Sequence, residues 1–326
     1  MAHRFVAPDI LVLASGGTLG EAWMSGLLAG VEEATGHDFR ETEAFVGTSA
    51  GSLVAAALAA GQRPRRPGGS AQQRSLAAGP PSDDVSAQAA APLGFARLPA
   101  PRAIVATLAR EALRIAGAAA TPLAPTALAV GANGSSALRA ALLHRTPGSD
   151  TSLSAIHERV SATGARFDGR LRVVAVDRQR GRRVVFGAPG APDATVAQAV
   201  QASCSVPWIF APVRIDDRDY VDGGVWSNTN LDVAPAGRAT EVLCLNPIAS
   251  LDIALASPFG VLRALAGSTA TLETLVLRNR GARVRMIGPD HDSARLMGPN
   301  LMDNERRDEV LASGFAQGVA MVGDSG

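Results

Sequence analysis

Apolar residues along this chain occur in short runs that alternate with stretches of helical periodicity, and glycine-rich turns separate them. The uninterrupted apolar run at residues 10–14 predicts a buried strand. The same reasoning predicts strands at residues 44–46, 171–177, 183–186, 242–245 and 284–287, and a hairpin at residues 213–221. Helices are predicted at residues 20–35, 52–58, 194–203, 262–277 and 302–322. Strands that alternate with helices favour a mostly parallel sheet covered on both faces, which places the chain in the α/β class.

The composition changes abruptly after Gly61. Residues 62–101 are rich in proline, glycine, serine, alanine and glutamine, with too few large apolar side chains to build a core. Residues 103–116 have one apolar face, which fits either an ordinary packed helix or a lid over an apolar cleft. We therefore expect one domain over residues 1–326, with a flexible insertion and a helical lid at about residues 62–150.

Charge and cysteine content narrow the possible functions. With 31 basic and 30 acidic residues the net charge is +1, so no overall field favours nucleic acid. Cys204 and Cys244 lie in apolar segments without metal-ligand spacing, which indicates reduced core thiols in a cytoplasmic protein. The N-terminus does not resemble a signal peptide, and no apolar run is long enough to span a membrane. We expect a cytoplasmic protein without metal or cofactor, whose membrane contact is at most peripheral.

Residues 47–51 (GTSAG) form a G-x-S-x-G motif between a short strand and a helix-forming stretch. A sharp strand-to-helix turn strains the backbone of Ser49 and pushes its hydroxyl out of the sheet. Gly47 and Gly51 let another segment or a substrate come close. The following helix N-terminus offers unpaired N–H groups to a developing negative charge. The motif therefore predicts a nucleophilic serine, with a simple glycine–serine turn as the alternative.

Two further motifs carry groups that such a serine needs. Asp222, followed by Gly223 and Gly224, places a carboxylate at a strand end, although Asp-Gly pairs are also common in hairpin turns. Residues 15–20 (SGGTLG) form a glycine-rich loop whose backbone N–H groups can make an anion pocket. A dinucleotide-binding loop is the alternative, but the first glycine of that fingerprint is replaced by Ser15.

The order of these three motifs resembles the patatin-like phospholipase family. The resemblance covers residues 9–61 and 165–290, and residues 11–20, 45–52, 201–207 and 212–228 carry it. It implies a three-layer α/β/α fold and hydrolysis of lipid acyl esters by a serine–aspartate dyad, through an acyl-serine intermediate. By position, Ser49 would be the nucleophile and Asp222 the general base. The oxyanion hole would be the backbone of Gly16, Gly17 and Thr18, with Gly47, Gly51, Gly223 and Gly224 as supporting positions.

The chain departs from the family pattern in the glycine-rich loop. Ser15 replaces a leading glycine, and Leu19 stands where the family has a basic residue. Leu19 leaves open a catalytically weak protein of the same fold that binds a lipid or a partner. A third alternative is a histidine-dependent α/β-hydrolase, because Ser49, Asp222 and His291 follow its chain order. Residues 288–292 are predicted to be a loop, which favours a solvated His291.

Overall fold

The computed structural model describes residues 5–68, 150–207, 209–249 and 258–323, together with four positions between 136 and 144. The predicted flexible insertion at residues 62–101 is therefore described only over residues 62–68. The amphipathic segment at residues 103–116, the proposed lid, lies outside the described residues.

The core of the fold is one eight-stranded sheet with the order β5-β6-β3-β2-β1-β7-β8, in which β4 also pairs with β3. Neighbours from β3 through β2, β1 and β7 to β8 are parallel, whereas the pairs β3–β4, β3–β6 and β5–β6 are antiparallel. The expected mostly parallel sheet is confirmed. Its strands are β1 Ile10–Leu13, β2 Ala44–Thr48, β3 Leu171–Asp177, β4 Arg182–Phe186, β5 Val213–Ile215, β6 Arg218–Asp222, β7 Glu241–Leu245 and β8 Arg283–Ile287.

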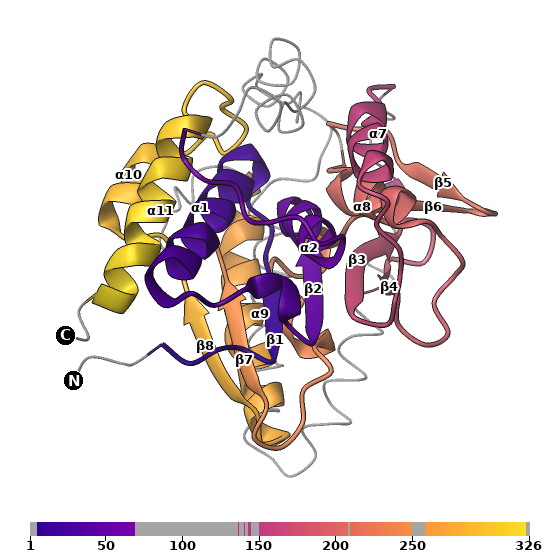
Figure 1. Cartoon of the computed structure of the whole chain (residues 1–326). Helices are drawn as coiled ribbons and strands as arrows, with labels where there is room; N and C mark the ends of the chain where they lie inside the picture. Colours follow the sequence, from indigo (N-terminus) through magenta and orange to yellow (C-terminus); the bar gives the residue numbers. More distant parts are fainter. Residues whose placement is uncertain are drawn as a thin grey trace.

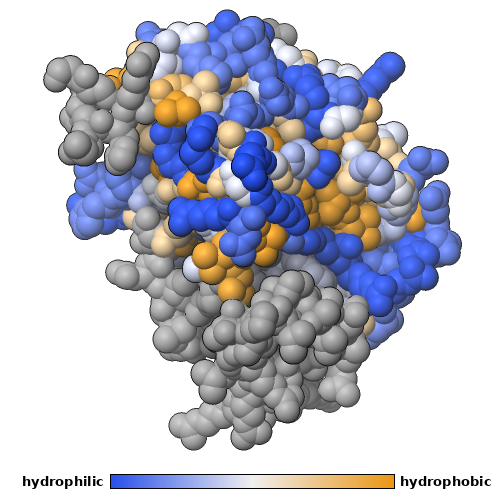
Figure 2. All heavy atoms as spheres, turned by 90° about the horizontal axis from the view of Figure 1, so that it is seen from below, coloured by the Kyte–Doolittle hydropathy of each residue, from blue (hydrophilic) through white to orange (hydrophobic). Residues whose placement is uncertain are grey.

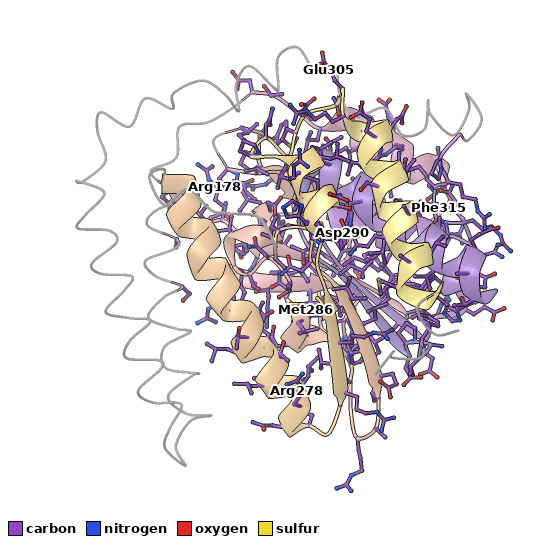
Figure 3. The ribbon with its side chains drawn as sticks, turned by 90° about the vertical axis from the view of Figure 1, so that its left-hand side faces the viewer. Arg178, Arg278, Met286, Asp290, Glu305 and Phe315 are labelled. Carbon is purple, nitrogen blue, oxygen red and sulfur yellow. The ribbon has the colours of Figure 1, made fainter. Side chains whose placement is uncertain are left out.

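Helices cover both faces of this sheet. Figure 1 shows α1 and α2 in front of it and α9 behind it. Seen from the side, α9 with Arg278 and α11 with Phe315 lie on opposite sides of the strands (Figure 3). The α-helices are α1 Gly17–Thr35, α2 Ala50–Ala59, α7 Ser154–Ala162, α8 Val196–Cys204, α9 Pro258–Asn279, α10 His291–Met297 and α11 Arg307–Gly323, and the 3₁₀ turns are η1 Phe39–Glu41, η2 Gly223–Val225 and η3 Leu231–Val233.

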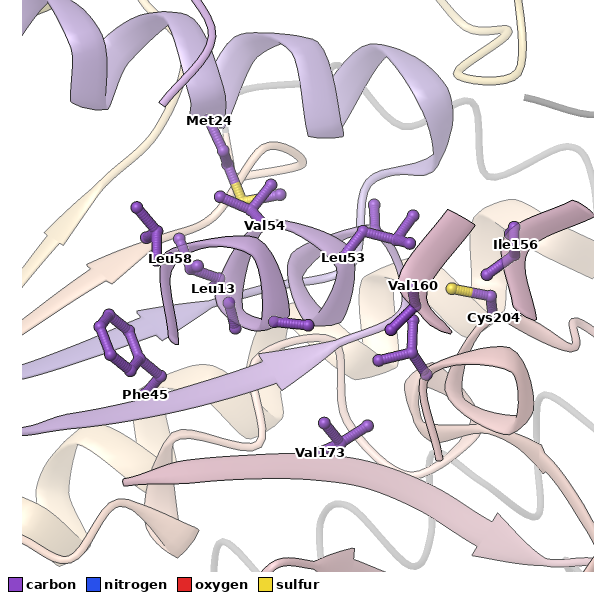
Figure 4. Packing of buried hydrophobic residues seen from close by; sticks show 14 of the residues in the cluster. Leu13, Met24, Phe45, Leu53, Val54, Leu58, Ile156, Val160, Val173 and Cys204 are labelled. Carbon is purple, nitrogen blue, oxygen red and sulfur yellow. The ribbon is translucent and has the colours of Figure 1, made fainter. Parts of the chain in front are cut away.

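The uninterrupted apolar run of β1 serves two cores. Leu11 and Leu13 pack in the cluster with α1, α2 and α8, whereas Ile10 and Val12 pack in the cluster with the end of α9. Figure 4 shows Leu13 beneath α2, whose Leu53 and Val54 separate it from α1. Side chains alternate between faces along a strand, and burying one large apolar side chain contributes about 1.5–3 kcal/mol. Both faces therefore stabilise the three-layer arrangement.

The C-terminal helix α11 packs directly against α1, backbone to backbone. A Cβ atom at Gly26 would overlap the carbonyl oxygen of Leu311, and one at Gly30 would overlap that of Phe315. A side-chain hydrogen bond of 2.8 Å from Trp23 Nε1 to Gln317 Oε1 joins the same two helices. The close approach fixes α1 along its length.

Several element boundaries differ from the sequence-based predictions. Helix α1 begins at Gly17 rather than residue 20, so most of the glycine-rich loop is its first turn. Helix α11 begins at Arg307 rather than residue 302. His291 is the first residue of α10 rather than part of a loop, because the Asp290 side chain caps that helix by accepting from Ser293 N at 2.8 Å. Helix α7 was not predicted, since only Ile156 and Val160 are buried on it.

Figure 2 views the molecule from below and shows hydrophilic residues lying across and beside apolar ones on that face. No helix in the described part of the chain is both long and apolar enough to cross a bilayer.

Candidate active site

Ser49 lies at a strained turn between β2 and α2. Its φ is 52°, in the left-handed region that a residue with a Cβ atom avoids, and such strain costs about 1–3 kcal/mol. A Cβ atom at Gly47 would lie 2.5 Å from Ser52 Cα, and one at Gly51 would overlap the carbonyl oxygen of Leu13. The two glycines of the motif are therefore required by the packing of this turn.

Hydroxyl groups hold the backbone of Ser49 in this conformation. Ser203 Oγ accepts from Ser49 N at 2.8 Å and donates to the carbonyl of Val174 at 2.6 Å. Ser52 Oγ donates to the carbonyl of Ser49 at 2.6 Å. Ser203 is fully buried and comes from α8, 154 residues along the chain from Ser49. The sequence analysis assigned Ser203 no role, although residues 201–207 carry part of the family resemblance.

The register of β3 brings Asp222 to Ser49. Strand β4 occupies one edge of β3 over residues 173–177, so β2 and β6 must share the other edge. On that edge Thr48 pairs with Val174, and Asp222 pairs with the next residue, Ala175. Because β2 is parallel to β3 and β6 is antiparallel to it, their carboxyl ends meet there. The residues that follow the two strand ends are thereby forced together.

The Asp222 carboxylate is buried, with a residue exposure of 4%. Gly224 N donates to its Oδ1 at 2.6 Å, and the Ser49 side chain lies near enough to lower its pKa. Burial raises the pKa of Asp222 from its ordinary value to about 6, although the Ser49 side chain and Gly224 N both act to lower it. The group is thus mostly ionised at neutral pH and takes up a proton far more readily than a free aspartate.

The glycine-rich loop forms the N-terminus of α1 beside this pair. Ser15 Oγ donates to Asn228 Oδ1 at 3.1 Å, and its backbone N–H donates to the carbonyl of Asn228 at 2.9 Å. A Cβ atom at Gly224 would lie 3.6 Å from Ser15 Oγ, so this loop touches the loop that follows Asp222. The serine that replaces the family's leading glycine therefore anchors the loop to Asn228.

Three backbone donors remain at this helix end. Leu19 N donates to the carbonyl of Leu301 at 3.0 Å. Among the described residues, no acceptor bonds the backbone N–H groups of Gly16, Gly17 or Thr18. Such unpaired groups and the helix dipole favour an anion. The side chain of Leu19 is fully buried in the core, so it leaves this pocket without a basic side chain.

Asn230 is a site residue that the sequence analysis missed. It is fully buried with a φ of 47°, and its Nδ2 lies 3.1 Å from Thr48 Oγ1 and 3.3 Å from the carbonyl of Gly223. One amide therefore bridges the residue before Ser49 and the residue after Asp222. Arg183 donates to Asn230 Oδ1 at 3.2 Å and fixes the orientation of the amide. The sequence offered one signal for Asn230, namely its place shortly after the Asp-Gly-Gly turn. Asparagine tolerates the left-handed conformation that such a loop can require.

His291 does not join this arrangement. Its side chain is 85% exposed, and its Nδ1 lies 3.6 Å from the carboxylate of its own neighbour Asp292. The expectation of a solvated His291 is therefore confirmed, whereas the predicted loop around it is wrong. Within the described ranges, no group of three or more potential metal ligands occurs. Cys204 and Cys244 are both buried and unpaired thiols.

The fold and this geometry define an α/β protein with a serine elbow beside a buried carboxylate. The chain belongs to the patatin-like phospholipase family, whose model matches residues 11–235.

Similar proteins include one viral sequence and several solved structures. The chain is 31% identical over 64 residues to the probable lipid hydrolase 463L of Invertebrate iridescent virus 6, a match that spans 20% of this chain and 22% of the viral protein. VipD from Legionella pneumophila aligns with 98% of this chain and 68% of its own at 15% identity and a TM-score of 0.43. ExoU in its complex with SpcU from Pseudomonas aeruginosa aligns with 97% of this chain and 51% of its own at 22% identity and a TM-score of 0.38.

Proposed function

We propose that the protein is a serine hydrolase that cleaves carboxylic esters of lipids, of the phospholipase A, lysophospholipase or carboxylesterase type. The observation that carries the proposal is the strained turn that places Ser49 beside the buried Asp222 carboxylate, because β2 and β6 end at adjacent residues of β3. Membership in a family described as phospholipases supports the lipid ester as substrate. The name of the viral relative, a probable lipid hydrolase, supports the same class.

In the first half of the proposed reaction, Ser49 Oγ attacks the carbonyl carbon of the ester as its proton passes to Asp222. The tetrahedral intermediate then collapses, the bond to the alcohol breaks, and Asp222 returns the proton to the departing alcohol. An acyl-serine remains. In the second half, Asp222 takes a proton from water, the hydroxide attacks the acyl carbon, and Ser49 recovers its proton as the fatty acid leaves. The raised pKa of Asp222 suits a base that must hold a proton only briefly.

The backbone N–H groups of Gly16, Gly17 and Thr18 are the proposed donors to the oxyanion. They sit at the end of a 19-residue helix, so the helix dipole adds to their effect. One such donor is typically worth about 2.7–4 kcal/mol in the transition state, which is enough to carry much of the catalysis without a basic side chain. Turnover is therefore compatible with Leu19 at this position.

The decisive experiment combines turnover with covalent labelling. Purified Ser49→Ala should hydrolyse a chromogenic acyl ester at least about 10³-fold more slowly than the wild-type protein, with an unchanged circular dichroism spectrum. A fluorophosphonate should label the wild-type protein at Ser49, because its phosphorus is attacked by an activated hydroxyl and fluoride leaves. His291→Ala serves as the matched control and should keep wild-type activity. Full activity of Ser49→Ala would refute the proposal, and loss of activity in His291→Ala would favour a histidine-dependent hydrolase.

The buried Leu19 motivates a second candidate, a protein that binds lipid or a partner with little turnover. This candidate predicts that the wild-type protein binds fatty acid but neither reacts with the fluorophosphonate nor hydrolyses any ester of a panel. If the protein reacts with the fluorophosphonate but hydrolyses no ester, the slow step would be the hydrolysis of the acyl-serine.

A further inference from the structure

A largely buried cluster of charges lies beside the first turns of α1. Glu21 Oε1 lies 3.5 Å from a terminal guanidinium nitrogen of each of three arginines, which come from distant segments. They are Arg65 after α2, Arg159 on α7 and Arg307 at the start of α11. We call these four residues the arginine cluster. Three cations thus converge on a single carboxylate oxygen.

The positive charge of the cluster exceeds what Glu21 neutralises. Glu21 brings one negative charge against three guanidinium groups, and the exposed Asp308 also acts on Arg307. Burial raises the pKa of Glu21, but the three arginines outweigh it and bring that pKa down to about 2. Burial and the two neighbouring guanidinium groups lower the pKa of Arg307 to about 10. A buried excess of one charge sign is costly unless a counter-ion is bound.

Two of the arginines also keep unused donors inside the cluster. Arg307 is only 8% exposed, and its Nε has no hydrogen-bond acceptor among the described residues. Arg65 Nη2, the nitrogen that faces Glu21 at 3.5 Å, is buried as well but makes no hydrogen bond to any described residue. Two forked groups with spare donors suit a phosphate, whose several oxygens can each accept.

The helices that carry the arginine cluster and the Ser49 elbow pack in one apolar cluster, to which α1, α2, α7, α8 and α11 all contribute. Glu21 follows Thr18 by three residues on α1, so the two lie on one face of the helix. The Cys204 thiol is within electrostatic range of Arg159, of Glu21 and of Asp222, and its Sγ lies 3.9 Å from Ser52 Oγ. The cluster and the Ser49 elbow therefore lie on the same side of the sheet. The glycine-rich loop itself offers no cationic side chain, since Leu19 is buried in the core.

We propose that the arginine cluster is a phosphate subsite, which holds the phosphate group of a lipid headgroup while the ester of the same molecule lies at Ser49. This inference rests on the proposed function and narrows its substrate class to phosphate-bearing lipids. Glu21 holds the three guanidinium groups together and reduces their net charge, so that the phosphate binds without being trapped.

The test compares two esters with the same acyl chain, a lysophosphatidylcholine and an uncharged monoacylglycerol. Arg65→Gln and Arg159→Gln should each raise KM for the lysophospholipid about tenfold and leave the kinetics on the monoacylglycerol unchanged. Arg66→Gln is the matched control, because Arg66 is the neighbour of Arg65 but pairs with the exposed Glu33. An equal effect on both esters, or none on either, would overturn the assignment of the cluster to a lipid headgroup.

Glu21→Gln gives a second test with the opposite sign. Removing the carboxylate should tighten phosphate binding, so inorganic phosphate should inhibit the variant at lower concentration than the wild-type protein, competitively with lysophospholipid. A structural ion cluster predicts instead a lower Tm that phosphate does not restore. A third outcome is that inorganic phosphate inhibits, but each arginine variant changes the hydrolysis of the two esters equally. The site would then take free phosphate rather than a headgroup, and the lipid assignment would be wrong.

The two proposals fail in different ways. If the wild-type protein hydrolyses no ester, the proposed function fails. The cluster is then still tested by the shift of Tm that inorganic phosphate causes in the wild-type protein, in Arg159→Gln and in Glu21→Gln. The expected order of the shift is Glu21→Gln above wild type above Arg159→Gln, and equal shifts would overturn the phosphate subsite.

Discussion

The strand ends that carry Ser49 and Asp222 and the helix end that carries Gly17 and Thr18 are held in different ways. Strands β2 and β6 end side by side because both pair with β3, at the adjacent residues Val174 and Ala175. The start of α1 instead depends on packing, through Leu19 N on the carbonyl of Leu301 and through α11 along its length. Leu301 and α11 lie beyond residue 235, where the family match ends. The proposed nucleophile and base are therefore positioned by the sheet, and the proposed oxyanion donors by packing against the C-terminal segment.

The largest change to the strand side is expected from Asp222→Asn. The amide keeps the shape of the side chain but accepts no proton, so kcat should fall by about 10³–10⁴. Because a buried carboxylate with a raised pKa is replaced by a neutral group, the free energy of unfolding at pH 8 should stay the same or increase. Ester hydrolysis and urea unfolding measure the two effects. A variant with near-wild-type kcat would remove Asp222 from the mechanism.

Asn230→Ala should break the bridge between the two strand ends. The variant loses the hydrogen bonds to Thr48 and Gly223, so Ser49 and Asp222 are no longer held at a fixed separation. We expect kcat to fall about 10²-fold with little change in KM, and the free energy of unfolding to fall by about 1–3 kcal/mol. Asn230→Asp, which keeps the shape but not the Nδ2 donor, should resemble Asn230→Ala. A loss of stability without any loss of kcat would limit Asn230 to a structural role.

The pH dependence separates activity from stability at Asp222. The base must be ionised, so kcat/KM should fall about tenfold per pH unit below its pKa of about 6. The folded pKa lies above the unfolded value, so the protonated group stabilises the fold, fully at low pH and progressively less as pH rises through 6. Between pH 4 and pH 6 activity should therefore rise while this contribution to stability falls. The difference between wild-type and Asp222→Asn unfolding free energies across this range isolates the contribution of this carboxylate.

The smallest expected effect on activity comes from the helix side. A side chain in Gly26→Val would overlap the carbonyl of Leu311 and push α11 away from α1, at a cost of about 1–3 kcal/mol in stability. Because α11 follows the segment that holds Leu19 N, kcat should fall several-fold at temperatures where the variant is still folded. Gly237→Val is the control, since an added Cβ there meets no atom within 4 Å. Unchanged kcat in folded Gly26→Val would show that the oxyanion end of α1 does not depend on α11.

Local sequence patterns predicted most of the helices and strands. They failed for elements that depend on contacts with distant parts of the chain. The apolar runs predicted the strands, because a buried strand requires consecutive apolar residues. The principal helices were predicted from their apolar periodicity and from the glycines that end them. Helix α7 buries only Ile156 and Val160, which is too narrow a stripe to stand out. The early start of α1 was missed because Gly17 and Gly20 are poor helix formers. The two glycines are needed in this turn because a Cβ atom would meet Leu301 at Gly17 and Pro247 at Gly20.

The sequence by itself determined the α/β class, the family resemblance and the three motifs that contain Ser49, Asp222 and the glycine-rich loop. Each motif is local, because a strained turn or a helix N-terminus requires particular residues at fixed spacing. Only the tertiary structure decided that β2 and β6 share one edge of β3, that Asn230 bridges them, and that three distant arginines meet at Glu21. Strand register and charge convergence join segments that lie far apart in the sequence, and no local spacing encodes such contacts.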